Sequence, residues 1–164
     1  MKKIKYDTQK YCFVKELKIL YKVDNLQKIH EEWSGAKKYE LLDDVETDQR
    51  TVYHKHFYEG ASKTKWYEIY DNFIKEIIRP MFSEAILYQK IPTFRVHQPG
   101  NLAVAAYHRD RDYAHSKYEV NFFLPLTPAF GTNTIWVESE EDKGDYAPFI
   151  SDFGECIMWD GARS

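Results

Sequence analysis

The spacing of hydrophobic residues along the chain changes near residue 90. Before that point, two stretches repeat their apolar residues at the three- and four-residue steps of a helix. The shorter stretch, Asp24–Trp33, begins with residues that favour a helix N-cap and ends at a Ser-Gly pair. The longer stretch, Ser62–Phe82, has Pro80 near its end. We therefore expect two amphipathic helices that turn their apolar sides to a core.

After residue 90 the pattern is that of short β-rich runs separated by turn residues. The six runs are Thr93–Gln98, Ala103–Asp110, Tyr118–Leu126, Thr134–Glu138, Tyr146–Ile150 and Glu155–Trp159. Helices packed against an antiparallel β-sandwich or barrel are expected from this order. The sequence thus predicts one domain of residues 1–164 in the α+β class, mainly β, in which residues 1–90 form a mostly helical layer.

Composition excludes several classes of protein. The chain of 164 residues is 43% hydrophobic and 16% aromatic, which is typical of a folded domain with a core. Its net charge of −3 argues against binding to nucleic acid or to an anionic membrane. Cys12 and Cys156 are too few for a disulfide framework, and no secretory signal or membrane-spanning run is present. We expect a soluble cytoplasmic protein.

Candidate chemistry lies at the end of the second β-rich run. His108 and Asp110 alternate along a predicted strand, so their side chains share a face. An imidazole and a carboxylate are two of the three ligands of the two-His, one-carboxylate site that holds ferrous iron. A strand end rich in surface ion pairs is an equally good interpretation of this tripeptide alone. His54 and His56 would share a face if extended, but no carboxylate lies near them at matching spacing.

Three longer segments add context to the tripeptide. They are FRVHQPGNLAVAAYHRDRDY, EVNFFLPLTPAFGTNTIWVESE and GECIMWDGA. In order and spacing they resemble the core of the iron(II)- and 2-oxoglutarate-dependent oxygenases, especially the branch that includes streptomycin-biosynthesis-type proteins. The resemblance covers Thr93–Ala162, under half of the chain.

The resemblance implies a double-stranded β-helix, also called a jelly roll or cupin-like fold, with an N-terminal helical layer. It implies Fe(II) and 2-oxoglutarate as cofactors, His108 and Asp110 as metal ligands, and a dioxygenase that hydroxylates a small molecule. The family's distal His and 2-oxoglutarate-binding Arg lie on two later strands, and the sequence stops at Ser164 before either position. We therefore expect an incomplete chain whose third metal ligand is not identified, and its own activity stays an open question.

Four further polar or aromatic residues are candidates for binding. Asn121 and Arg95 could contact 2-oxoglutarate, since amides and guanidinium groups bind carboxylates. Trp136 and Glu138 alternate on a predicted strand and could contact the substrate. Three of them have a structural alternative, which is a satisfied core amide for Asn121, a surface ion pair for Arg95 and a strand-end charge in water for Glu138.

Two other functions stay open. The same β-rich half could be a binding module or a cupin-like isomerase in which His108 and Asp110 form hydrogen bonds without a metal. It could also be an inactive fragment, in which case exposed strand edges would favour a homodimer.

Overall fold

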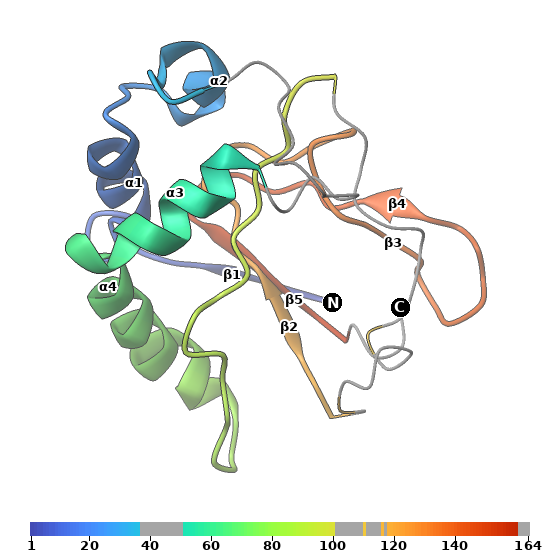
Figure 1. The fold of residues 1–164 in the computed structure, drawn as a ribbon. Coiled ribbons are helices and arrows are strands. Elements are labelled where there is room, and N and C mark those ends of the chain that lie inside the picture. Colours follow the sequence, from blue (N-terminus) through green and yellow to red (C-terminus); the bar gives the residue numbers. More distant parts are fainter. Residues whose placement is uncertain (37–50, 101–109, 111–115, 117, 161–164) are drawn as a thin grey trace. The chain divides into compact units, whose positions relative to one another are not determined.

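The computed structural model describes residues 1–36, 51–100, 110, 116 and 118–160, which belong to two compact units. The sheet unit combines Met1–Tyr6 with Ala105–Ser164, and the helical unit is Asp7–Val104. Each unit is described by itself below (Figure 1). Within the described ranges, no helix is long and apolar enough to cross a membrane.

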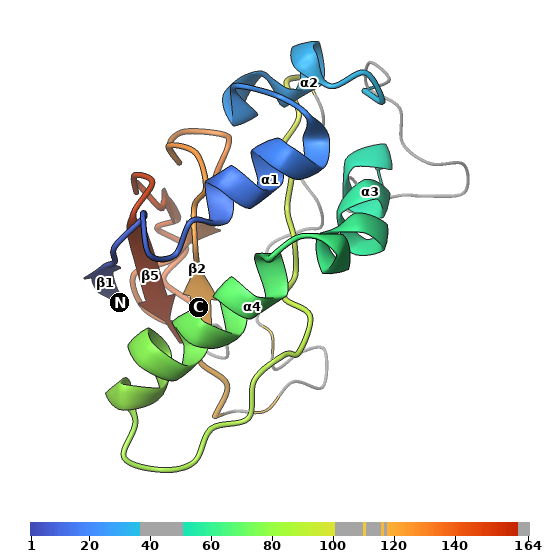
Figure 2. The same ribbon diagram turned by 90° about the vertical axis from the view of Figure 1, so that its left-hand side faces the viewer.

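The helical unit is a succession of short helices. They are α1 (Phe13–Tyr21), η1 (Leu26–Lys28), α2 (Ile29–Glu32), α3 (Val52–Gly60), η3 (Ala61–Lys63), α4 (Trp66–Phe73), the π-helical turn η4 (Ile74–Ile78) and η5 (Arg79–Met81). Helix α1 forms because Phe13, Leu17 and Tyr21 are buried at four-residue steps, and it packs against α4 (Figure 2).

Both helices predicted from the sequence are present, each as consecutive shorter pieces. The stretch 24–33 contains η1, whose N-cap Asn25 accepts a hydrogen bond from Gln27 N, followed by the four-residue α2. The stretch 62–82 contains α4, η4 and η5, and Pro80 lies in η5, where it cannot donate to a continuing helix. Helices α1 and α3 were not predicted.

Aromatic side chains form the core of the helical unit. Phe57 of α3 stacks on Phe94 with ring centroids 4.0 Å apart and planes 11° apart. Trp66 of α4 meets Phe57 edge-on at 5.3 Å and Phe13 of α1 at 4.9 Å. These rings bury large apolar areas and add favourable ring geometry. Three helices and the extended segment that carries Phe94 therefore share one core.

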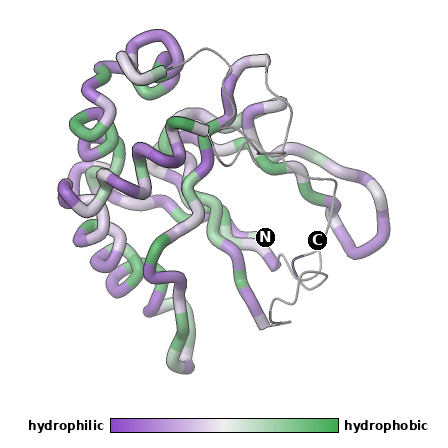
Figure 3. The backbone as a smooth tube through the Cα atoms, viewed as in Figure 1, coloured by the Kyte–Doolittle hydropathy of each residue, from purple (hydrophilic) through white to green (hydrophobic). Residues whose placement is uncertain are grey.

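The sheet unit has two small antiparallel sheets. The larger contains β1 (Lys2–Lys5), β5 (Glu155–Trp159) and β2 (Asn121–Phe123), with β5 in the centre (Figure 1). The register pairs Ile4 with Cys156 and Asn121 with Trp159. The smaller sheet pairs β3 (Trp136–Val137) with β4 (Ala147–Pro148), and the loop between them is largely hydrophilic (Figure 3).

The predicted fold class is wrong. The N-terminal half is helical and the described strands form a three-stranded sheet and a two-residue ladder, which is not a mainly β protein with a double-stranded β-helix. Of the six predicted runs, 155–159 is confirmed as β5, and three others contain strands of only two or three residues. Except for Asp110, the run 103–110 lies outside the described residues.

The run Thr93–Gln98 shows why the prediction failed. Its burial alternates as in a strand, since Phe94 and Gln98 are buried whereas Arg95 and His97 are exposed. Its backbone is nonetheless bound by side chains of α3: Phe94 N donates to Tyr58 Oη at 3.0 Å and Val96 N to His54 Nε2 at 3.3 Å. Alternation identifies extended backbone but not the group that pairs with it.

Candidate functional site

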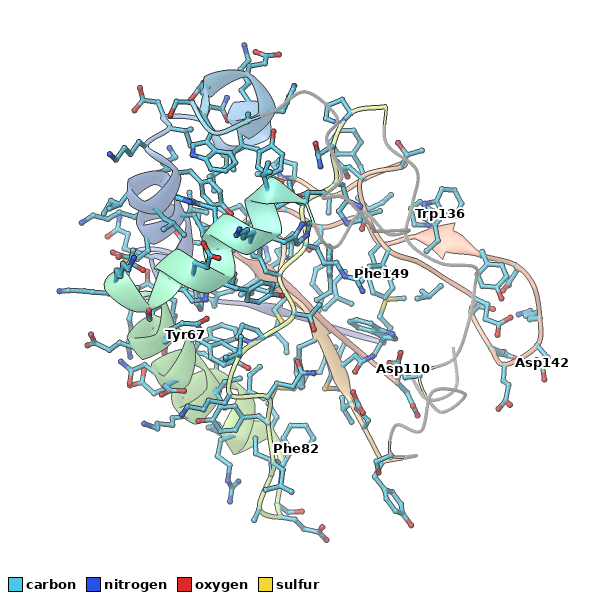
Figure 4. All side chains as sticks on the ribbon, viewed as in Figure 1. Tyr67, Phe82, Asp110, Trp136, Asp142 and Phe149 are labelled. Atoms are coloured by element: carbon cyan, nitrogen blue, oxygen red, sulfur yellow. The ribbon has the colours of Figure 1, made fainter. Side chains whose placement is uncertain are left out.

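Asp110 and Asn121 are brought together in the sheet unit. Asn121 lies at the start of β2, and its side-chain Nδ2 donates a hydrogen bond to Asp110 Oδ2. Both residues are half-buried, and Asp110 is labelled in Figure 4. The acidic residue of the His108–Asp110 motif is therefore held against a paired strand. His108 lies outside the described residues.

Aromatic residues share the face of the sheet to which Asn121 belongs. Residues opposite one another in an antiparallel pair project to the same side, so Trp159 lies beside Asn121 and Ile157 beside Phe123. Phe149 packs against Trp159, with ring centroids 5.2 Å apart, and against Phe123 at 6.0 Å. The polar pair Asp110–Asn121 therefore lies beside aromatic and apolar side chains at the β2 end of this face, whereas its β1 end carries the Lys3–Glu155 ion pair.

Trp136 and Glu138, the predicted substrate contacts, lie at the smaller sheet. Figure 4 shows Trp136 apart from Asp110. The Trp136 ring is 38% exposed, and its Nε1 donates to Gly131 O at 2.8 Å. Glu138 is buried and accepts hydrogen bonds from Asp142 N at 3.0 Å and Gly144 N at 2.9 Å. Both carboxylate oxygens of Glu138 thus hold the β3–β4 loop, and its contact with substrate stays a prediction.

Arg95, the second predicted 2-oxoglutarate contact, belongs to the helical unit. It is exposed on the segment 93–98, which α3 holds through Tyr58 and His54. Because His54 Nε2 accepts from Val96 N, the ring proton lies on Nδ1 and donates to Thr51 Oγ1 at 2.9 Å. Burial, together with the charges of Arg95 and His97, lowers the pKa of His54 to about 4. His54 is therefore neutral at pH 7.

The helix α3 also separates the two histidines of the sequence VYHKHFYEG. Residues two apart on a helix point to different sides, so the two-His arrangement considered for an extended segment does not form. His56 instead lies by Leu20 O, with Nε2 at 3.0 Å from it. Among the residues that the structure describes, no group of three His, Cys, Asp or Glu side chains could hold a metal ion.

Two further titratable groups of the sheet unit are fixed in one protonation state at neutral pH. Burial raises the pKa of the Cys156 thiol to about 12, so this cysteine is not a thiolate nucleophile. Hydrogen bonds from Lys3, the Asp152 backbone and Ser151 lower the pKa of Glu155 to about 2. The Lys3–Glu155 ion pair, at 2.8 Å, therefore joins β1 to β5 over the neutral range.

The sequence interpretation missed the residues that hold these segments in place. His54 and Tyr58 are four residues apart, which places them on one side of a helix. If α3 had been predicted, this spacing would have indicated that the two side chains can contact the same segment. Trp159 could be placed beside Asn121 only from the strand register, which no local pattern fixes.

Comparison with known proteins gives one named relative and no fold assignment. No protein-family model matches the chain, and no solved structure matches it. The chain is 40% identical over 119 residues to the streptomycin biosynthesis protein StrG of Streptomyces griseus. A match of 119 residues within 164 begins no later than residue 46 and ends no earlier than residue 119, so it includes His108 and Asp110.

The match covers 73% of this chain and 55% of the relative, so the chain spans about half the length of that curated protein. At this identity and length the chain is related to the streptomycin biosynthesis protein StrG.

Proposed function

We propose that the chain carries part of the active site of a biosynthetic non-haem iron(II)- and 2-oxoglutarate-dependent dioxygenase that hydroxylates a small molecule. The observation that supports this most is the hydrogen bond from Asn121 to Asp110, which holds the acidic residue of the motif against the paired strand β2. The name of the relative supports a biosynthetic role. Because the chain spans about half of that relative, the activity of the whole protein is part of the proposal.

The chemistry of the donor pair fits ferrous iron. A neutral imidazole from His108 and a carboxylate from Asp110 are two of the three protein ligands that such iron sites use. With O₂ and 2-oxoglutarate, bound iron would supply one oxygen atom to a C–H bond of the substrate while 2-oxoglutarate is converted to succinate and CO₂. The third protein ligand is left unassigned.

The residues of the chain would hold and shield this chemistry. His108 and Asp110 would bind the ion, and the rings of Phe149 and Trp159 would cover part of the side of the sheet that Asn121 occupies. Arg95 is the candidate for a 2-oxoglutarate carboxylate, because a guanidinium can donate two parallel hydrogen bonds. Trp136 and Glu138 are the candidates for substrate contact.

A turnover assay tests the proposal. The protein is purified as this chain and as a chain extended through the two later strands that the resemblance implies. Each is mixed with Fe(II), ascorbate, 2-oxoglutarate and air, and succinate is measured against a blank without protein. We expect succinate above the blank from the extended chain, and we expect His108→Ala and Asp110→Ala in that chain to return it to the blank. Asp142→Asn is the matched control, because this exposed acidic residue of the β3–β4 loop lies apart from Asp110 (Figure 4).

Equal succinate from the wild type, His108→Ala and Asp110→Ala would contradict the proposal. So would an extended wild-type chain that gives no succinate and binds no divalent metal, since a metal-free binding module or isomerase would then account for the motif.

A further inference from the structure

The backbone fixes where the Asn121 side chain begins. Asn121 opens β2, and three consecutive pairs with β5 set its register, from Asn121–Trp159 to Phe123–Ile157. Strand β5 is in turn paired along its other edge with β1. A residue on a strand beside a central strand of this kind has little freedom to shift along the sheet. The backbone position of Asn121 is therefore fixed, and a side chain that forms a hydrogen bond with its amide is held in place by the sheet.

Asp110 is held in this way by a hydrogen bond from the Asn121 side chain. The Nδ2 group of an asparagine can only donate and a carboxylate oxygen can only accept, so the bond orients the amide and Asp110 Oδ2 together. The two residues are 11 positions apart in the chain. Asp110 lies outside the strands, and Asn121 gives its carboxylate a defined direction relative to the sheet.

A carboxylate that binds a metal is usually oriented by such a partner. Hydrogen bonds to the ligands of a metal ion fix their geometry, and loss of one costs metal affinity although the partner never touches the ion. An amide that bound 2-oxoglutarate would behave differently, because its loss would weaken the binding of 2-oxoglutarate and leave the affinity for the metal unchanged. The two roles therefore predict changes in different dissociation constants.

We infer that Asn121 is a positioning residue, which orients the Asp110 carboxylate for a divalent cation and is not itself a contact for 2-oxoglutarate. The inference rests on the proposed function, in which Asp110 is a metal ligand. It replaces the cofactor role expected for Asn121 from the sequence with a role that acts through Asp110.

Mn(II) binding to the full chain tests the inference, with free Mn(II) measured by electron paramagnetic resonance. The variants are Asn121→Ala, which removes the amide, and Asn121→Leu, which removes it with little change in volume. We expect both to bind Mn(II) about 10- to 100-fold more weakly than the wild type. At saturating Mn(II), we expect the dissociation constant for 2-oxoglutarate to stay within about threefold of the wild type.

Asn133→Ala is the matched control. The Asn133 amide also lies in the sheet unit, where it donates to Pro128 O at 3.2 Å and its oxygen accepts from Phe130 N at 2.7 Å. These bonds stabilise a turn before β3, so the variant should lose stability and retain the affinity for Mn(II). Circular dichroism of each variant identifies any that fails to fold, and Asn121→Leu then supplies the test if Asn121→Ala does not fold.

The outcomes separate the inference from the proposed function. Wild-type affinity for Mn(II) in the folded Asn121 variants, with Asp110→Ala defective, overturns the inference alone. Unchanged Mn(II) binding with weakened 2-oxoglutarate binding overturns it in favour of a cofactor contact. Wild-type affinity in Asp110→Ala, or no binding by the wild type, overturns the proposed function and the inference with it.

Discussion

His54 of α3 binds an extended segment through one ring nitrogen and the N-cap residue of its own helix through the other. It is buried on α3, donates from Nδ1 to Thr51 and accepts from Val96 N through Nε2. A protonated ring could not accept the second bond, and burial beside Arg95 and His97 already disfavours its charge. The Val96–His54 hydrogen bond, one of the contacts that hold the segment with Arg95, therefore forms only while His54 is neutral.

This arrangement predicts that stability falls in mild acid. The unfolded chain binds a proton at His54 near pH 6.5 and the folded chain binds it near pH 4, so protons favour the unfolded state between these values. The contribution of His54 is complete above pH 6.5 and is lost as the pH falls toward 4. Urea unfolding from pH 7 to pH 4 measures it, and His54→Gln should flatten the profile.

His30→Gln is the control, since that half-buried histidine lies on α2 and pairs with Glu31. A pH profile that is the same for the wild type and His54→Gln would show that His54 does not titrate as described.

At the level of single residues, the sequence identified candidates whose roles in binding stay predictions. It identified Asp110 and Asn121 as polar residues of interest, and the structure joins them by a hydrogen bond. The contact itself could not be predicted, because it depends on where the chain before β2 meets the sheet. Glu138 was expected to face substrate or water, yet its oxygens accept from Asp142 N and Gly144 N. Both donors lie in a loop with positive φ angles, which alternation does not reveal.

Helices α1, α3 and α4 are held together by rings from each of them. Phe57 is fully buried and contacts both Trp66 and Phe94, so it joins α3 to α4 and to the segment 93–98. A ring with neighbours on several elements leaves a cavity when it is removed, because those elements cannot all move inward. Phe57 is therefore a central residue in the packing of the helical unit.

We expect Phe57→Ala to lower the free energy of unfolding by about 3–5 kcal/mol, as for other buried aromatic residues. Ile19→Ala, at a position of α1 that is 55% exposed, should change it by less than about 0.5 kcal/mol. Chemical denaturation monitored by circular dichroism measures both values. A loss below about 1 kcal/mol for Phe57→Ala would be inconsistent with this core.

Long or doubly paired elements were easier to predict from the sequence than short ones. The apolar repeat of 62–82 is long, so its helical character was clear, whereas its π-helical turn at Ile74–Ile78 changes hydrogen bonding without changing the repeat. The pattern of β-rich runs closed by turn residues predicted the strand at 155–159, and β5 is central and paired on both sides. It overestimated the run 146–150, in which only Ala147–Pro148 is a strand and Pro148 cannot donate to a ladder.

In the whole molecule, the N-terminal residues belong with the C-terminal part. Strand β1 pairs with β5 through four residues, and Tyr6 N donates to Gly154 O at 3.0 Å just beyond it. The sheet unit is therefore formed from both ends of the described chain (Figure 1). The sequence did not reveal this pairing, since contacts between residues so far apart leave no local pattern.

Deletion of residues 1–5 should therefore destabilise the sheet unit. Removing β1 exposes the backbone edge of β5 and breaks the Lys3–Glu155 ion pair. Strand β1 pairs with β5 through four residues. At about 0.5–1.5 kcal/mol for each of roughly four lost hydrogen bonds, we expect a loss of about 2–6 kcal/mol. Thermal unfolding measures this loss, and light scattering measures association through the exposed edge. A truncated chain as stable as the wild type would contradict the pairing.

If His108 and Asp110 bind one divalent metal ion, the stoichiometry of bound metal shows it. The intact chain is titrated with Co(II) under anaerobic conditions, and the bound metal is counted by elemental analysis after gel filtration. We expect one Co(II) per chain in the wild type and in Asp142→Asn, and none in His108→Ala or Asp110→Ala. A wild-type chain that retains no Co(II), or variants that retain as much as the wild type, would contradict it.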